Sequence, residues 1–336
     1  MDVVRKIAEA VLYEGYVLWP YRKSAMKNQQ RWTFGGVYPR AYSEARGEDD
    51  PWLMQTQCLV LGDREAKAEV KVRFLHVTER KVATKSGEIL EFVEELQVGG
   101  DQYLPWDEAT EREITIGQCR LSELQDTPER ARIDIPGESS QEEITGPTGD
   151  VLGAFVRSWL ALSGKVEVEA EALREGIFRL TVKITNTTPW EGEDRENTLR
   201  RTFSSTHTTL QVVGGRFVSM TDPPEPLREL AERCENKKTW PVLVGEEGAQ
   251  NMLLSSPIIL SDYPQIAPES PGDMFDGGEI DQLLILNILT LTDEEKVEMR
   301  ASDPRAREIL DRCESLSQEQ LMNLHGAIRE FRVLRD

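Results

Sequence analysis

The strongest constraint on the fold is a two-residue periodicity in residues 166–184. Apolar side chains occupy every second position of residues 166–172, with glutamates between them, and again of residues 178–184, with arginine, lysine and threonine between them. Residues 174–176 (Arg-Glu-Gly) separate the two runs and supply a turn. This pattern is typical of two half-buried antiparallel strands joined as a hairpin. The opposite charges of the two runs also predict cross-strand ion pairs on the outer face.

Further short strands are predicted within residues 58–217. Alternating apolar positions mark residues 70–76, and short runs rich in β-branched residues follow at 114–116, 208–212 and 216–218. Successive antiparallel strands with polar outer faces favour a sandwich or a wrapped sheet over a doubly wound α/β domain. Residues 121–149 are acidic and rich in turn residues, and we interpret them as an exposed connection.

Helices are predicted at both ends of the chain. Residues 3–12 carry apolar side chains at helical spacing. Near the other end, Thr292 and Glu295 form a capping box, and Asp303-Pro304 supplies an N-cap followed by a proline at the first helical position.

We therefore predict an α+β fold with an antiparallel β-rich core, either sandwich-like or a wrapped sheet. The predicted regions are 1–45, with a short helix and a basic aromatic segment; 46–220, the β-rich domain; and 221–336, mainly α-helical and packed on the β domain.

Residues 15–43, the basic aromatic segment, differ from the rest of the chain. They contain no Asp or Glu, although the chain has 60 acidic residues and a net charge of −20. Five basic residues make the segment +5, so the remainder carries −25. The neighbourhood 13–42 also holds five of the seven tyrosines. A segment so unlike its chain is expected to dock, either on the protein's own acidic body or on a partner.

Three interpretations of the basic aromatic segment are open. It clamps the protein's own surface, it recognises a partner protein through residue types that dominate interface hot spots, or it stacks on single-stranded nucleic acid. The net charge of −20 repels a polyanion and disfavours nucleic acid. The partner-binding residues that we predict are Tyr16, Trp19, Tyr21, Arg22, Lys27, Arg31 and Trp32.

Residues 262–281 form a second distinctive segment, with six carboxylates within twenty residues. Such oxygen clusters suit hard divalent cations, but the spacing of an EF-hand is absent. A helix start explains most of the same acids, because Ser270 and Asp273 also match an N-cap box. The candidate metal ligands are Asp262, Glu269, Asp273 and Asp276.

Other catalytic signals are weak. The three histidines, His76, His207 and His325, lie far apart, and no HExxH or GxSxG motif accompanies them. We predict a core position for His76 and a strand end or turn for His207. The four cysteines form no CxxC pair, and the glycine motifs of nucleotide-binding loops are absent. We predict no cofactor, and the lack of catalytic motifs favours a protein that is not an enzyme.

The chain also lacks a membrane-spanning signal. Its longest uncharged apolar run is ten residues, 282–291, and a bilayer requires about 20. The first residues show no apolar core of a signal peptide, so we expect a cytoplasmic protein.

Short motifs at both ends of the chain carry a family resemblance. They are LYEGY at 12–16, PYR at 20–22, KN at 27–28, RW at 31–32, FG at 34–35, PESPGD at 268–273, LTLTDEE at 289–295 and DPRA at 303–306. These motifs resemble a bacterial family, often actinobacterial, that is encoded beside high-affinity uptake nickel–iron (NiFe) hydrogenases. The strand-rich middle is similar only in general pattern.

The resemblance implies a hydrogenase accessory or assembly protein and supplies no catalytic residues. Together with the charge segregation, it leads us to expect a non-catalytic protein that docks a partner, a NiFe hydrogenase subunit or maturation factor. Two alternatives are a metal-dependent enzyme or metal carrier that uses residues 262–281, and a scaffold that self-associates as a homo-oligomer through the basic aromatic segment.

Overall fold

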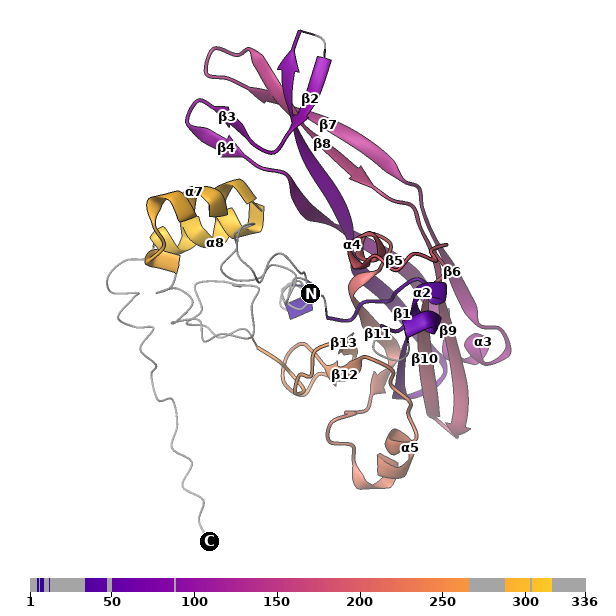
Figure 1. The fold of residues 1–336 in the computed structure, drawn as a ribbon. Helices are drawn as coiled ribbons and strands as arrows, with labels where there is room; N and C mark the ends of the chain where they lie inside the picture. The colour runs from indigo at the N-terminus through magenta and orange to yellow at the C-terminus, as the bar shows by residue number, and fades with distance from the viewer. Residues whose placement is uncertain are drawn as a thin grey trace.

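The computed structural model describes residues 5, 7, 8, 12, 34–46, 50–87, 89–265, 288–302 and 304–315. Within these residues the fold is α+β and mostly antiparallel sheet, as predicted (Figure 1). Eleven of the described strands form one continuous sheet, and β3 and β4 pair separately. Residues 5, 7, 8 and 12 are helical, in agreement with the predicted N-terminal helix.

The strands in chain order are β1 (Leu53–Ser86), β2 (Ile89–Val93), β3 (Leu96–Val98), β4 (Asp101–Tyr103), β5 (Trp106–Arg120), β6 (Glu129–Ile135), β7 (Glu138–Thr145), β8 (Val151–Trp159), β9 (Leu162–Arg174), β10 (Ile177–Asn186), β11 (Ser204–Phe217), β12 (Trp240–Leu243) and β13 (Met252–Ser256). The helices are α2 (Arg40–Arg46), α3 (Leu121–Asp126), α4 (Arg195–Leu199), the short 3-10 turn η2 (Glu225–Leu227), α5 (Arg228–Glu232), α7 (Asp293–Ser302) and α8 (Pro304–Glu314).

Strand β1 is the spine of the fold and runs for 34 residues. Its residues 53–61 pair with β10, residues 60–75 with β11 and residues 67–80 with β5. Farther along, residues 79–84 pair with β8 and residues 82–86 with β2. Strand β1 therefore pairs first with β10 in one layer of the body and then with β11 and β5 in the other layer. Its last residues pair with β8 and β2, in a part of the sheet that projects beyond both layers.

A glycine corner lets β1 pass from one layer into the other. Between Gly62 and Lys67 its pairing with β11 is irregular, and Gly62 lies opposite Gly215. A Cβ on Gly215 would stand 2.8 Å from the carbonyl oxygen of Leu61, and a Cβ on Gly62 would stand 2.8 Å from the Cβ of Ala66. The two strands can cross this closely because neither carries a side chain at the crossing.

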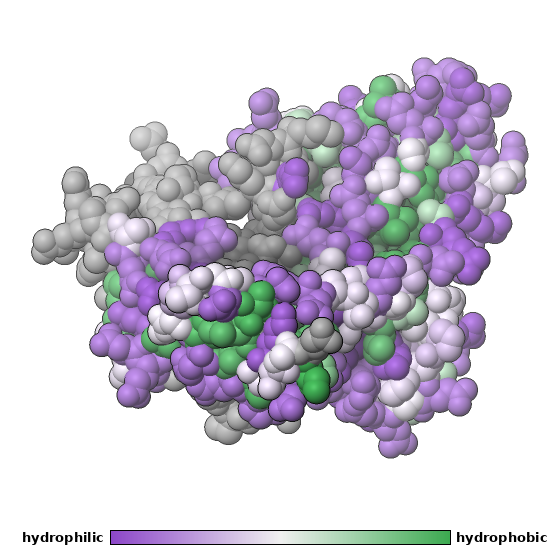
Figure 2. All heavy atoms as spheres, turned by 90° about the horizontal axis from the view of Figure 1, so that it is seen from above, coloured by the Kyte–Doolittle hydropathy of each residue, from purple (hydrophilic) through white to green (hydrophobic). Residues whose placement is uncertain are grey.

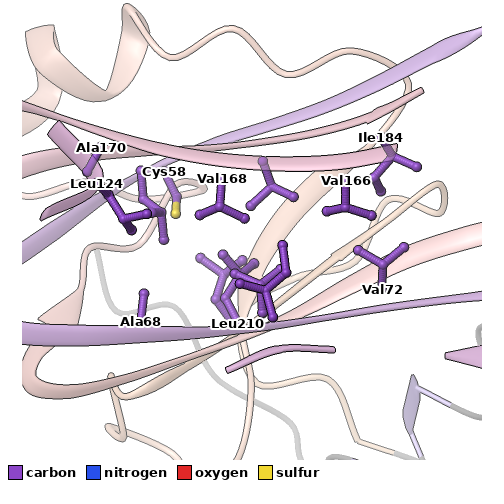
Figure 3. Packing of buried hydrophobic residues seen from close by; sticks show 14 of the residues in the cluster. Cys58, Ala68, Val72, Leu124, Val166, Val168, Ala170, Ile184 and Leu210 are labelled. Atoms are coloured by element: carbon purple, nitrogen blue, oxygen red, sulfur yellow. The ribbon is translucent and has the colours of Figure 1, made fainter. Parts of the chain in front are cut away.

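The main core lies between the two layers. In Figure 3, Val166, Val168 and Ile184 from β9 and β10 point toward side chains of the opposite layer, namely Ala68, Val72 and Leu210. Helix α3 adds buried leucines at one side of this core. Each fully buried Val, Leu or Ile contributes roughly 1.5–3 kcal/mol to folding, so this cluster is the main source of stability.

Strands β9 and β10 form the hairpin that the periodicity of residues 166–184 predicts. Lys183 lies opposite Glu167 and Arg179 lies opposite Glu171. The Nζ atom of Lys183 is 2.8 Å from Oε1 of Glu169, and Arg179 pairs with Glu171. The predicted cross-strand ion pairs are thus confirmed. They are partly exposed, and each contributes about 1 kcal/mol or less.

Two segments differ from the prediction. Residues 121–149 contain α3, β6 and β7, so their interpretation as an exposed connection is wrong. Both strands lie at sheet edges. Strand β7 has one apolar residue, Ile144, and so shows no alternation, whereas β6 alternates Ala131, Ile133 and Ile135 with charged residues over a run of only seven residues. Strands β12 and β13 extend the sheet within residues 221–336, where the sequence predicts mainly helix.

A projecting part of the sheet, here called the arm, consists of β1 from Val77 onward with β2, β3, β4, β7 and β8 (Figure 1). Strands β2 and β8 flank the same residues of β1, and β7 follows beyond β8. The β3–β4 hairpin covers one face through a small cluster that includes Val82, Val98 and Ile144. The arm therefore has its own apolar contacts, separate from the main core.

Helices α7 and α8 pack on β1 beside the base of the arm. Leu75 and Val77 are buried there against helix side chains that include Met299, Ile309 and Leu310. The predicted capping box is confirmed: the Thr292 amide donates to Oε2 of Glu295 at 2.9 Å, and the Glu295 amide donates to Oγ1 of Thr292 at 3.2 Å. Pro304 is the first residue of α8, as predicted, and Asp303 lies outside the described residues.

Candidate functional site

The seven predicted partner-binding residues all lie outside the described residues; they are Tyr16, Trp19, Tyr21, Arg22, Lys27, Arg31 and Trp32. Residues 34–43, the last part of the basic aromatic segment, are described and pack on the protein's own body. Val37 forms a β-bridge with Phe203, and the buried rings of Tyr38 and Tyr42 stack with centroids 5.9 Å apart. This part of the segment therefore packs on the protein's own body through Val37 and the two tyrosines.

Of the four candidate metal ligands, Asp262 is described, whereas Glu269, Asp273 and Asp276 lie outside the described residues. Both carboxylate oxygens of Asp262 accept hydrogen bonds from the protein. Oδ2 accepts from the hydroxyls of Ser219 and Thr221 at 2.5 and 2.8 Å, and Oδ1 accepts from the amide of Leu243 at 2.8 Å. These bonds fasten the chain after β13 to the edge strand β12, which is a structural role for the carboxylate.

The two described histidines are buried and neutral. Burial, and to a smaller extent the positive charge of Arg112, lowers the pKa of His76 to about 4. Burial also lowers the pKa of His207 to about 4. Its Nδ1 lies 3.3 Å from the carbonyl oxygen of Ser205, and its Nε2 has no hydrogen-bond partner within the described ranges. His207 therefore makes no described bond to a serine hydroxyl that would activate a nucleophile.

His76 occupies the predicted core position on β1, with no exposed surface. His207 lies within β11 and not at a turn, because a bulge lets the strand continue through the hydroxyl-rich residues before it. Ser205 there has a φ of 51°, a backbone conformation that is costly for a residue other than glycine.

The cysteines show no activated thiol. Burial raises the pKa of Cys234 and of Cys313 to about 11, and it raises the pKa of Cys58 further above the usual range. All are free thiols that are protonated at neutral pH. In the described part of the chain, no three His, Cys, Asp or Glu side chains gather as metal ligands, and no helix is long and apolar enough to cross a bilayer.

A network of ion pairs, here called the arm junction, joins the strands at the base of the arm. Glu108 on β5 accepts from Arg80 of β1 at 2.8 Å and from Arg157 of β8 at 2.6 Å, and Arg157 also binds Glu142 of β7 at 2.5 Å. The ring of Phe155 lies 4.7 and 5.2 Å from the two guanidinium carbons. Four strands are thus joined by charges. Arg80 and Glu108 are largely shielded from water, whereas Glu142 is 62% exposed.

Arg80 also ties the arm to the C-terminal helices. Its Nη2 donates to the carbonyl oxygen of Leu104 at 2.9 Å and to the carbonyl oxygen of Ala301, in α7, at 3.0 Å. The side chain is only 5% exposed. A buried guanidinium with several fixed acceptors holds its neighbours in one arrangement, so the arm junction fixes how the arm leaves the body.

The end of the arm carries exposed apolar side chains. Ile89 and Phe92 on β2 are 64% and 62% exposed, and Leu152 on β8 is 41% exposed. Figure 2 shows apolar surface gathered over this part of the molecule, bordered by hydrophilic side chains. The Nζ atom of Lys81 lies 5.6 Å from the centre of the Phe92 ring. By their register Phe92 and Leu152 lie on one face of the sheet and Ile89 lies on the other. These three exposed side chains at the end of the arm are named the arm-end patch.

Sequence reasoning missed both the arm junction and the arm-end patch. The signal for the patch is the short apolar run ILEFV at residues 89–93, two residues after Gly87, which has a φ of 65°. The members of the arm junction come from four strands and share no sequence spacing, so no local pattern connects them.

No protein-family model matches the chain, and no curated protein matches it.

Proposed function

We propose that this protein is a non-catalytic accessory protein that docks a partner protein through the arm-end patch. The observation that carries the proposal is the large exposed fraction of Ile89 and Phe92 on one short strand. The two side chains lie on opposite faces of β2, so the end of this strand exposes apolar surface on both sides. Exposed apolar surface of this kind marks interaction sites, and aromatic side chains rank among the usual anchors of protein interfaces.

The arm junction supports the same function. Binding is costly when the binding element must first be ordered. Arg80 and Glu108 fix the base of the arm against the body and α7, which reduces that cost. The polar surface around the patch then suits the rim of an interface.

The first partner to test is a NiFe hydrogenase subunit or maturation factor. This choice rests on the sequence motifs that resemble the hydrogenase-associated bacterial family. The basic aromatic segment is proposed as a second contact, through its predicted residues from Tyr16 to Trp32.

The test is recovery of the tagged protein from native cells, followed by identification of the proteins that remain bound. We expect a hydrogenase component to accompany the wild type. The double variant Ile89→Thr/Phe92→Thr should recover at least tenfold less of it, since loss of central apolar anchors costs about 2 kcal/mol or more.

The matched control is Ile259→Thr. Ile259 is 73% exposed and lies outside the arm, so its substitution removes similar apolar surface without touching the patch. Equal recovery of the partner by the double variant and the control would contradict docking through the arm. Absence of any hydrogenase component, together with intact hydrogenase activity in a gene deletion, would contradict the proposed partner.

A further inference from the structure

Three of the edge strands in the main sheet are protected against pairing with another chain. Strand β6 carries Arg130 and Arg132, whose side chains are 62% and 80% exposed. Strand β7 has the sequence ESSQEEIT, with every residue but Ile144 exposed. Charged and polar side chains of this kind discourage the addition of a strand.

Strand β12 is protected in a different way. It contains Pro241, which has no amide hydrogen to donate. The amide of Leu243 donates to Asp262 at 2.8 Å, and its carbonyl oxygen accepts from the amide of Tyr263 at 2.8 Å. The neighbouring chain therefore already uses the backbone groups at the end of this strand.

Strand β2 is the exception. Among the described strands it pairs only with β1. Strand β5 also pairs only with β1, but it carries six charged side chains. Its five residues, ILEFV, include one charge, and Ile89 and Phe92 are more than 60% exposed. An apolar edge that is neither covered nor charged is the kind of edge to which an extended segment adds as a further strand.

The charges on β2 and directly after it are negative, whereas Lys81 and Lys85 lie on the neighbouring strand β1. Glu91 in β2 and Glu94 and Glu95 directly after it are exposed. None of the three forms a salt bridge with a lysine or arginine of the described ranges. The complement to this edge is an extended segment in which basic side chains alternate with apolar ones.

We propose that β2 is a strand-addition site that takes an extended, basic, apolar-alternating segment of a partner protein. The inference rests on the proposed docking function and specifies its mode. Main-chain hydrogen bonds from the edge of β2 supply affinity. Leu90 and Phe92, which share one face of β2, receive the apolar side chains, and Glu91 on the other face selects lysine or arginine.

A second copy of this chain fits the site less well. Symmetric antiparallel pairing of β2 with itself about its central residue places Glu91 against Glu91, which is destabilising. The net charge of −20 adds a general repulsion between copies. The charge pattern therefore favours a basic partner.

The first experiment measures binding of a labelled nine-residue peptide that alternates lysine and valine to the full-length protein, by fluorescence anisotropy. A peptide of the same composition with its lysines and valines in separate blocks is the control for simple charge attraction. We expect the alternating peptide to bind at least tenfold more tightly. Equal affinities would overturn the proposal, because they would indicate only non-specific attraction to an acidic chain.

Backbone pairing is tested with two N-methylated versions of the alternating peptide. Methyl groups on one alternate set of amides block the edge that faces β2, and methyl groups on the other set leave it free. We expect one version to lose at least tenfold in affinity and the other to bind as before. An equal effect of both methylation patterns would contradict strand addition.

The location is tested with Glu91→Lys. This variant should bind the lysine–valine peptide at least tenfold more weakly and should gain affinity for a glutamate–valine peptide, whereas Ile259→Thr should change neither. Hydrogen exchange should show new protection in residues 89–93 on peptide binding. Protection elsewhere, or a dimer in light scattering that Phe92→Thr abolishes, would overturn the assignment.

The two proposals fail differently. If native partner capture depends on the arm-end patch but peptide binding ignores alternation and N-methylation, docking stands and strand addition is wrong. If the peptides behave as expected but no native partner is captured, β2 is a strand-addition site and the accessory function is wrong.

Discussion

Mild acid should destabilise the fold through its two buried histidines. His76 and His207 have no exposed surface, and burial holds the pKa of each at about 4, against about 6.5 in an unfolded chain. Between these values the unfolded chain binds protons that the folded chain does not. Stability is therefore fully present above pH 6.5 and falls as the pH drops toward 4.

The magnitude follows from the two pKa values. At pH 5 each histidine lowers the free energy of unfolding by about 2 kcal/mol relative to pH 8, so the pair lowers it by about 4 kcal/mol. This is a large part of the typical 5–15 kcal/mol stability of a protein. Carboxyl groups with ordinary pKa values stay mostly ionised above pH 5 and contribute little in this window.

The assay is urea unfolding at pH 8 and pH 5, followed by circular dichroism. The double variant His76→Gln/His207→Gln should lose most of the difference between the two pH values, whatever its absolute stability. Arg132→Gln, at a side chain that is 80% exposed, is the control and should keep the wild-type difference. A wild type with equal stability at both pH values, or a double variant with the full difference, would refute the reasoning.

Three further outcomes follow from the fold. Glu108→Gln leaves the buried Arg80 without its charge partner and should lower the free energy of unfolding by about 3 kcal/mol; a loss below 0.5 kcal/mol by urea titration would contradict the arm junction. Gly215→Ala should cost about 2 kcal/mol at the glycine corner, whereas Gly117→Ala, where an added Cβ meets nothing within 4 Å, should cost little; similar losses would contradict the corner. Elemental analysis of protein purified without chelators should find no stoichiometric metal, and Asp262→Ala should lower thermal stability through its lost hydrogen bonds. Bound metal that disappears in the Asp262→Ala variant would favour the metal-dependent alternative.

The sequence predicted those parts of the fold whose signals are local. The β9–β10 hairpin and the capping box of Thr292 and Glu295 depend on spacings within about twenty residues, and both are confirmed. The full length of β1 was not predictable in this way. The charged residues 63–65 interrupt the apolar alternation of β1 at the glycine corner. Residues 70–76 were therefore the part of β1 whose pattern predicted a strand.

The candidate site depends on contacts that are distant in sequence. Glu108, Arg80 and Arg157 meet because β5 and β8 both pair with β1, and no single segment contains that information. The basic aromatic segment attracted the prediction of a docking surface because its composition is unusual. The arm-end patch is compositionally ordinary, and only its exposed fraction in the fold distinguishes it.

The most direct test of docking through the arm is site-specific photo-crosslinking in native cells. A photoreactive phenylalanine analogue replaces Phe92 in one strain and Ile259, which is also apolar and is more exposed, in another. We predict a discrete crosslinked product at position 92 that contains a hydrogenase component and is absent at position 259. No product at position 92, or the same products at both positions, would contradict the account.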